Sequence, residues 1–272
     1  RAFEASADLT QSDISDNSQT VDNIRLWDPT VLAETYSQLQ EIRAYYALKE
    51  VDVDRYVIDG KLTQVMVSAR ELDQTNLPAE GWVNQRLQYT HGFGVVFSPA
   101  NAVANQGQPD FYVKGVPAST SVSELTIDQP RIYFGESAES SEYVVVNSLQ
   151  EEVDYPLSTE GQSVAYTNYS GDGGVSIGSF FKRLGFALRY SELNLLISNQ
   201  LSDTSKLIME RNIISRVKKA APFLYTDNDP YLALIDGELF WIIDMYTVSD
   251  RYPYAQPADS GRINERSGLP RN

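Results

Sequence analysis

Two stretches of the chain share one pattern of polar and apolar positions. Residues 52–69 begin with Asp-x-Asp-x-Tyr, continue as an apolar strand closed by Ile-Asp-Gly, and resume as a second apolar strand. Residues 227–247 repeat this order. Asp-Gly between two apolar runs is a strong hairpin signal, because glycine adopts the positive φ that a tight turn requires. The pattern therefore predicts two β-hairpins, with Gly60 and Gly237 in their turns.

Each hairpin follows a stretch with the spacing of an amphipathic helix. Asp28 and Pro29 provide an N-cap and a proline at the first helical position. Helical spacing places the buried stripe of this helix at Val31, Thr35, Leu39, Ile42 and Tyr46. A later helix is expected from about Ser202 until Pro222 stops it. Its apolar face comprises Leu207, Ile213 or Ile214, Val217 and Ala221.

The shared order predicts an internal α-β-β duplication, with modules at about 28–73 and 202–250. The alternative is a pair of unrelated hairpins that share a common turn. Between the modules we expect helical turns at 82–89, loop over most of 101–130, and a helix from about 179 to 190. Strands are expected at 95–97 and as a pair formed by 131–135 and 143–146.

These elements predict an α+β fold of mixed helices and antiparallel hairpins, because helices and strands do not alternate regularly. Residues 1–23 are polar and are expected to form a loose lead-in. Residues 24–254 are expected to form the globular region, followed by a polar tail at 255–272.

Composition narrows the functional classes. The net charge of −15 opposes binding to nucleic acid or to an anionic membrane surface. The chain has no cysteine, which excludes disulfides and thiol chemistry. No stretch approaches the roughly 18 consecutive apolar residues of a membrane-spanning helix. Because Arg1 is not followed by a leader sequence, we expect a mature product or an excised piece.

Motifs for catalysis are weak, and we predict no catalytic residue and no cofactor. Ser176 lies in Gly-x-Ser-x-Gly, but no strand delivers it, and the sole histidine, His91, lies upstream of it rather than downstream. The same glycine-rich segment lacks the lysine of a phosphate loop. Carboxylates such as Glu71, Asp73, Glu152 and Asp154 are too numerous in this chain to identify a glycosidase pair.

Metal binding also has little support, and we predict no metal site. One histidine and no cysteine disfavour zinc. Calcium at the Asp-x-Asp pairs (Asp52 with Asp54, Asp227 with Asp229) stays open, although acceptance of backbone hydrogen bonds is the simpler role.

Aromatic residues around His91 suggest a binding surface. Glycines flank Tyr89-Thr90-His91-Gly92-Phe93-Gly94 and suggest close backbone approach. A crevice between two copies of a module is a common ligand site. We therefore expect a concave, partly aromatic surface formed by Tyr89, His91, Phe93, Tyr252 and Tyr254. A hydrogen-bonded structural role for His91 is the alternative.

Several long motifs resemble uncharacterised protein family 0182. They include Ile24-Arg25-Leu26-Trp27-Asp28, the segment from Tyr89 to Gly94 and Gln129-Pro130-Arg131-Ile132-Tyr133-Phe134-Gly135-Glu136. Ala221-Pro222-Phe223-Leu224 and Tyr252-Pro253-Tyr254 match as well, and the resemblance runs in order from about Arg1 to Tyr254. Phe93 stands where the family pattern leads us to expect tyrosine.

The resemblance implies a large bacterial integral membrane protein with N-terminal transmembrane helices and a big extracytoplasmic region. It places this chain at the cell membrane, on the extracytoplasmic side, as the first part of that region. Its expected partners are its own transmembrane helices, the remaining extracytoplasmic region, and an envelope protein, glycan or lipid-linked ligand. The expected function is binding, sensing or interaction; the alternative is a cell-envelope hydrolase with an unrecognised site.

Overall fold

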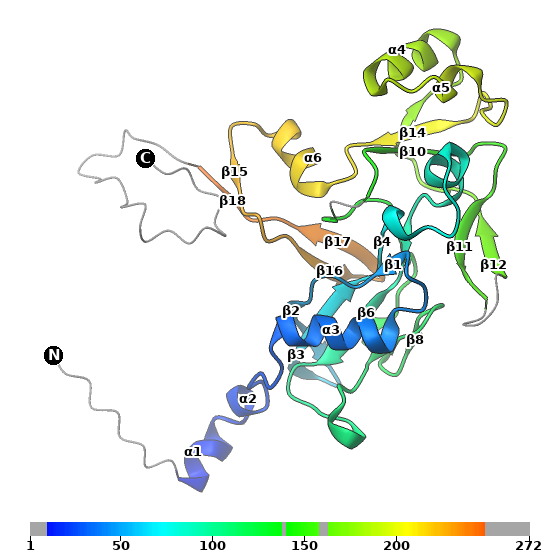
Figure 1. The fold of residues 1–272 in the computed structure, drawn as a ribbon. Coiled ribbons are helices and arrows are strands. Elements are labelled where there is room, and N and C mark those ends of the chain that lie inside the picture. The colour runs from blue at the N-terminus through cyan, green and yellow to red at the C-terminus, as the bar shows by residue number, and fades with distance from the viewer. Residues whose placement is uncertain (1–9, 138–139, 158–162, 248–272) are drawn as a thin grey trace, which may run out of the picture.

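The computed structural model describes residues 10–137, 140–157 and 163–247. It has the mixed helices and antiparallel strands predicted for an α+β fold (Figure 1). Its largest sheet has the strand order β2-β3-β6-β7-β8, with every neighbouring pair antiparallel. These strands span Asp52–Ile58 (β2), Lys61–Ala69 (β3), Val95–Pro99 (β6), Val113–Lys114 (β7) and Ser119–Thr120 (β8).

The second half of strand β3 is buried on both faces. Val65 and Val67 belong to a core with Leu232 and Leu234 of β16 (Tyr231–Ile235). Met66 points the other way, into a core with residues of α3 (Pro29–Gln40). Successive side chains of a strand alternate between faces, so β3 lies between α3 and the hairpin of β16 and β17 (Glu238–Ile242).

The second predicted hairpin contacts the first directly. The Leu232 amide donates a hydrogen bond to Asp52 Oδ2 at 3.4 Å, and the Leu234 amide donates to Tyr56 Oη at 2.8 Å. Asp52 and Tyr56 both come from the Asp-x-Asp-x-Tyr motif of the first module. The residues that begin the first hairpin therefore hold the second one in place.

The two modules have the same order of elements. The first runs α3, β1 (Tyr46–Ala47), the β2–β3 hairpin and β4 (Glu71–Leu72), and β1 pairs with β4. The second runs α6 (Ile213–Ala220), β15 (Tyr225–Thr226), the β16–β17 hairpin and β18 (Met245–Tyr246), and β15 pairs with β18. Only the first hairpin extends into a larger sheet, because β3 also pairs with β6. Common ancestry of the modules stays a prediction.

A separate lobe packs on a second small sheet. Its strands have the order β10-β14-β13 and span Tyr143–Val146, Lys206–Met209 and Val175–Ser176, respectively. The helices α4 (Phe180–Tyr190) and α5 (Asn194–Ile197) lie against it at the upper right of Figure 1. The core of this lobe contains Leu87, Val145, Ala187, Leu195 and Leu207.

Short elements complete the described chain. The predicted lead-in contains α1 (Gln11–Asp16) and α2 (Ser18–Val21), neither of which buries a side chain. The predicted turns at 82–89 form a π-helix, Asn84–Gln88. Single 3-10 turns occur at Gln74–Asn76, Asn105–Gly107 and Ser123–Leu125. The remaining strands are β5 (Gly92–Phe93) with β9 (Arg131–Ile132), and β11 (Glu152–Pro156) with β12 (Val164–Thr167).

The buried stripe predicted for the first helix is wrong by one position. Leu32 and Tyr36 are buried, whereas Val31 is exposed. The helix ends at Gln40, so the apolar spacing that continues to Tyr46 runs past the helix into β1. The N-cap prediction is confirmed, because Asp28 Oδ1 accepts a hydrogen bond from the Thr30 amide at 2.9 Å.

Two further predictions need correction. Residues 206–209 form strand β14 rather than helix, because Leu207 and Ile208 pair with β13 and β10 in the lobe sheet. The helix is confined to α6. The strands at 131–132 and 143–146 exist but do not pair with each other: β9 pairs with β5, and β10 pairs with β14. Pairing between distant strands cannot be deduced from alternation within each strand.

The predicted turn glycines have positive φ, at 73° for Gly60 and 83° for Gly237. Replacing Gly60 by alanine should cost about 1 kcal/mol, because nothing crowds a Cβ there and only the backbone conformation is strained. Gly237→Ala should cost more, because its Cβ would lie 2.5 Å from Asp128 Oδ2. Urea denaturation of both variants tests whether Gly237→Ala loses more stability than Gly60→Ala. Equal stability of the two variants and the wild type would contradict it.

Candidate functional site

The residues predicted to bind a ligand are only partly accessible. His91 and Phe93 are 1% and 4% exposed, whereas Tyr89 is half-buried and packs edge-on against Tyr45. Tyr252 and Tyr254 lie outside the described residues. In this structure His91 and Phe93 are too enclosed to touch a ligand at the surface, so binding through this set of residues stays a prediction.

The backbone beside His91 approaches its neighbour as closely as the flanking glycines predict. A Cβ on Gly92 would lie 2.3 Å from the carbonyl oxygen of Arg70. That oxygen accepts a hydrogen bond from the Phe93 amide at 3.0 Å. Glycine at 92 therefore allows β5 to lie against the end of β3, and this contact positions His91 in the interior.

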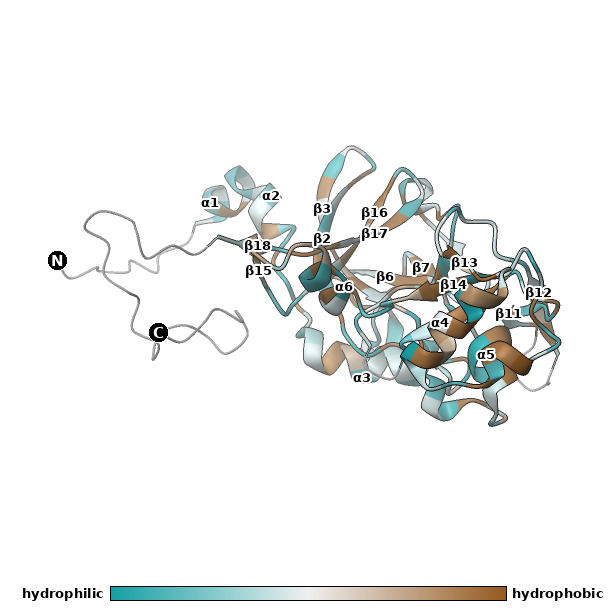
Figure 2. Cartoon of the chain, turned by 90° about the horizontal axis from the view of Figure 1, so that it is seen from above, coloured by the Kyte–Doolittle hydropathy of each residue, from teal (hydrophilic) through white to brown (hydrophobic). Residues whose placement is uncertain are grey.

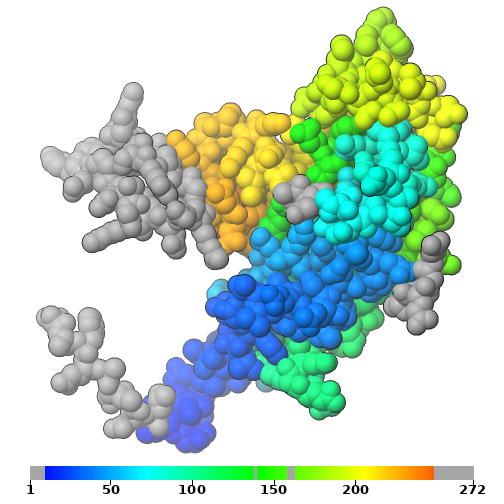
Figure 3. Space-filling model, viewed as in Figure 1, coloured from blue at the N-terminus to red at the C-terminus, as the bar shows by residue number. Residues whose placement is uncertain are grey.

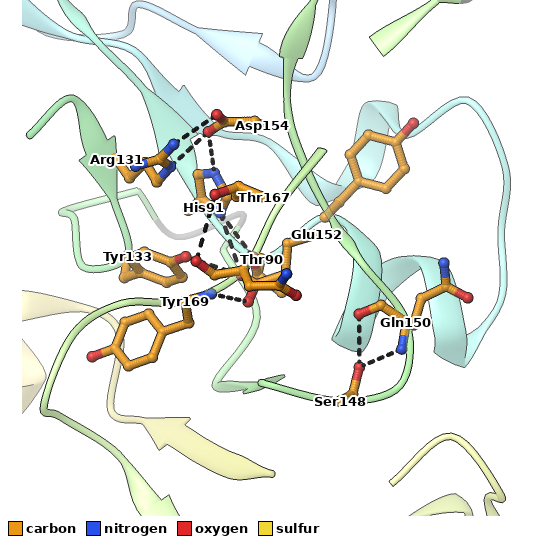
Figure 4. Close-up of polar contacts among 12 residues, drawn as sticks. Thr90, His91, Arg131, Tyr133, Ser148, Gln150, Glu152, Asp154, Thr167 and Tyr169 are labelled. Atoms are coloured by element: carbon orange, nitrogen blue, oxygen red, sulfur yellow. Dashed lines mark hydrogen bonds and ion pairs between the residues drawn. The ribbon is translucent and has the colours of Figure 1, made fainter. Parts of the chain in front are cut away.

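A buried polar network surrounds the His91 ring (Figure 4). Nδ1 lies 2.8 Å from Thr90 Oγ1, and Nε2 lies 3.3 Å from Asp154 Oδ1. The Thr90 hydroxyl donates its proton to Glu152 Oε2, so Thr90 Oγ1 accepts from Nδ1. Both ring nitrogens of His91 therefore have polar partners inside the network.

The two carboxylates of the network are satisfied by several donors. Glu152 also accepts hydrogen bonds from Tyr133 Oη at 3.0 Å and the Tyr169 amide at 3.1 Å. Asp154 accepts two from Arg131, from Nε at 2.7 Å and from Nη2 at 2.8 Å. Burial acts to raise the pKa of Asp154, but the hydrogen bonds from His91 and Arg131 outweigh it and lower the pKa overall.

The network places the His91 ring and the Arg131 guanidinium against two carboxylates. It joins β5, β9 and β11, which are far apart in the sequence. The Arg211 guanidinium adds a further link by donating to the Thr90 carbonyl at 2.8 Å. One signal for this network is the spacing of Glu152 and Asp154, which are two positions apart and therefore lie on the same face of a strand. The arrangement supports a structural role for His91.

Ser176 lies away from such a catalytic arrangement. The expectation that no strand delivers it is wrong, because Ser176 ends the two-residue strand β13. It is exposed, however, and both ring nitrogens of His91 contact other groups, Thr90 and Asp154. We therefore expect a fluorophosphonate probe to leave the purified chain unlabelled, because the sole histidine contacts other groups and does not activate this hydroxyl. Labelling that is abolished in Ser176→Ala, but retained in an exposed-serine control such as Ser119→Ala, would contradict this and favour the hydrolase alternative.

An open groove of about 900 Å³ lies where the two modules meet. It is lined by the start of α3, the segment before and at the start of β2, and the segment before β16. Residues of both Asp-x-Asp-x-Tyr motifs line it, including Asp52, Asp229 and Tyr231. Figure 3 shows the blue first module and the orange second hairpin bordering a hollow at this side of the molecule.

The groove is strongly acidic. Four carboxylates line it: Glu34, Glu50, Asp52 and Asp229. Among the described lining residues Lys49 is the one base, and its Nζ lies 3.4 Å from Asp73 Oδ2.

Burial and mutual repulsion raise the pKa values of acids at the groove. Burial raises the pKa of Asp52 to about 7; the hydrogen bond from Leu232 opposes this, and the charge of Asp229 adds to it. Burial and the charges of Glu50 and Glu71 raise the pKa of the neighbouring Glu136 to about 9. A positive group placed in this groove would therefore be attracted and would favour release of protons from these carboxyls.

The geometry does not gather these acids around one point. Within residues 10–137, 140–157 and 163–247, no group of three or more histidine, aspartate or glutamate residues is placed to hold a metal ion. Asp52 instead accepts the backbone hydrogen bond from Leu232 described above, as the simpler role predicts.

The structure thus defines a mixed α+β protein with an acidic groove between two hairpin modules and a separate buried polar network. The chain belongs to the Uncharacterised protein family (UPF0182), whose family model matches residues 1–269. The resemblance found in its motifs is confirmed at the level of the family.

Relatives in several organisms match nearly the whole chain. A UPF0182 protein of Pelotomaculum thermopropionicum is 46% identical over 259 residues, which are 94% of this chain and 28% of the relative. One from Methanospirillum hungatei is 44% identical over 98% of this chain and 29% of the relative. One from Trichodesmium erythraeum is 46% identical, with coverage of 94% and 28%. The chain therefore spans less than a third of these relatives, and no solved structure matches it.

Within the part of the chain that the structure describes, no helix combines the length and the apolar character needed to cross a bilayer.

Proposed function

We propose that this chain is an extracytoplasmic binding module of a bacterial multi-pass membrane protein. We further propose that the acidic groove is its ligand surface and that it receives a positively charged segment of a protein partner. The observation that carries the proposal is the groove itself, which both Asp-x-Asp-x-Tyr motifs line.

The shape and charge of the groove support binding of an extended ligand. Ligand sites commonly form between structural units and have volumes in this range. Four lining carboxylates against one lysine favour a cationic partner. The tyrosine of the second motif, Tyr231, adds aromatic contact area next to Asp229.

The membrane assignment rests on the motif resemblance. The relatives are more than three times as long as the matched segment, which leaves room for transmembrane helices and for further extracytoplasmic sequence. Those parts are the expected covalent partners of this module. Their position relative to the groove decides which ligands reach it.

Site-specific crosslinking in the full-length protein tests the groove. A photo-reactive residue replacing Thr30, at the exposed rim, should capture a partner in membranes of the producing cells. The same residue at Ser119, on the opposite edge of the five-stranded sheet, is the matched control. Capture at Thr30 should fall about fivefold in Asp229→Asn and should weaken with salt.

Two results would contradict the proposal. One is equal capture from Thr30 and Ser119, which would show that partners do not bind the groove in preference to the opposite edge of the sheet. The other is capture that Asp229→Asn and salt leave unchanged, which would remove the electrostatic basis. Recovery of the full-length protein from the soluble fraction rather than from membranes would contradict the membrane assignment alone.

A further inference from the structure

The outer surface of α4 and α5 is apolar. Five large side chains there are between 63% and 82% exposed: Phe180, Phe181, Leu188, Leu193 and Ile197. We call this set the α4–α5 face. Figure 2 shows hydrophobic residues along both helices, and Figure 3 shows the lobe projecting from the rest of the molecule.

Helical geometry explains why Phe181 and Leu188 share a side of α4. Phe181 and Leu188 are seven positions apart, which is close to two turns, so they lie one above the other. Ala187 lies on the other side of α4 and is buried in the lobe core. The helix is therefore apolar both toward the core and toward the outside. An exposed apolar cluster of this kind marks an interaction surface.

Helix α4 itself is basic, in contrast to the whole chain. It contains no aspartate or glutamate but includes Lys182, Arg183 and Arg189, in a chain of net charge −15, and Glu192 follows it beside Leu193. Lys182 is exposed. Arg183 donates to the Ile177 carbonyl at 2.9 Å, and Arg189 pairs with Glu210 at 2.7 Å. The helix thus combines outward phenylalanine and leucine with basic flanks.

We propose that the α4–α5 face binds the surface of an anionic lipid bilayer. Phenylalanine and leucine on one face with lysine or arginine beside them are typical of helices that lie in the plane of a membrane interface. The apolar side chains enter the boundary between headgroups and acyl chains, and Lys182 contacts anionic headgroups. The lobe projects far enough for α4 and α5 to make this contact without burying the acidic groove. The proposal is independent of what the groove binds.

Flotation with lipid vesicles tests the proposal on the purified chain. Vesicles of equal parts phosphatidylcholine and phosphatidylglycerol should bind it, and pure phosphatidylcholine should bind less. Phe181→Ser combined with Leu188→Ser should weaken binding at least about tenfold, because two apolar side chains no longer leave water. Phe223→Ser, at a comparably exposed phenylalanine after α6, is the matched control and should bind as the wild type does.

Further variants separate this proposal from others. Lys182→Gln should weaken binding to anionic vesicles, and added salt should have the same effect. Asp229→Asn, in the acidic groove, should leave vesicle binding unchanged. All substituted side chains on the face are exposed, so unchanged thermal unfolding should show that the fold is intact.

Several results would overturn the proposal. Absence of binding to anionic vesicles would do so, as would equal weakening by Phe223→Ser and by the double variant. A wild-type dimer that the double variant converts to a monomer, without vesicle binding by either, would assign the face to a second copy of the chain instead.

Discussion

Asp154→Asn should destabilise the protein by about 3 kcal/mol, the order of magnitude measured when one partner of a buried ion pair is removed. Asp154 is 5% exposed and accepts hydrogen bonds from His91 and from both Nε and Nη2 of Arg131. The substitution removes the negative charge that pairs with the Arg131 guanidinium and leaves that cation without its carboxylate partner. Because the folded pKa of Asp154 is lowered below 3.8, its stabilisation is present above that value and is lost as the pH falls through the folded pKa.

Urea denaturation followed by tryptophan fluorescence measures this loss. Glu151→Gln, at an exposed acid three positions before Asp154, is the matched control and should change the free energy of unfolding by less than about 0.5 kcal/mol. A double variant that also carries Arg131→Met should lose less than the sum of the two single losses, because the residues interact directly. An Asp154→Asn variant as stable as the control would refute a stabilising role for the network.

Asp52→Asn should make the protein more stable at pH 8, by about 1–3 kcal/mol. The pKa of Asp52 is about 7 in the folded protein, whereas that of a solvent-exposed aspartate is 3.8. Between about pH 3.8 and pH 7, Asp52 is therefore protonated in the folded state and ionised in the unfolded state. The contribution of Asp52 to stability is complete below pH 3.8 and is lost as the pH rises through 7. Asparagine keeps an oxygen for the Leu232 amide and carries no charge.

The measurement is the free energy of unfolding of both proteins from pH 4 to pH 9. The difference between them should be small at pH 4 and should reach its full value near pH 8. Glu136→Gln provides an internal comparison, since the pKa of Glu136 is about 9 and its effect should continue to grow above pH 8. Parallel curves for wild type and Asp52→Asn would show that Asp52 is not buried among the acids of the groove.

The local elements could be predicted because each depends on a few neighbouring residues. The Asp-Gly turns, the N-cap at Asp28 and the helix at 180–190 are of this kind. Strand pairing and burial could not be predicted in the same way. Leu207 and Ile208 have apolar spacing that fits helix or strand, and only the presence of β10 and β13 on either side decides between them.

The same reasoning explains the outcome for the candidate sites. The glycines around His91 correctly indicated close backbone approach, but the same closeness encloses the ring. Glu152 and Asp154 were visible only as two acids among 37. The groove depends on Asp52 and Asp229 meeting across two modules, a contact that the repeated motif suggests only once the hairpins are known to be neighbours.

The placement of β3 between α3 and the second hairpin also determines the order in which the chain can mature. Val65 and Val67 gain their contacts with Leu232 and Leu234 only after β16 has been synthesised, some 180 positions after Asp52. Until then one face of the first sheet lacks part of its cover. Contacts between such distant segments slow folding and prolong the exposure of apolar strands. We therefore expect a chain that ends before residue 231 to expose the face of β3 that carries Val65 and Val67.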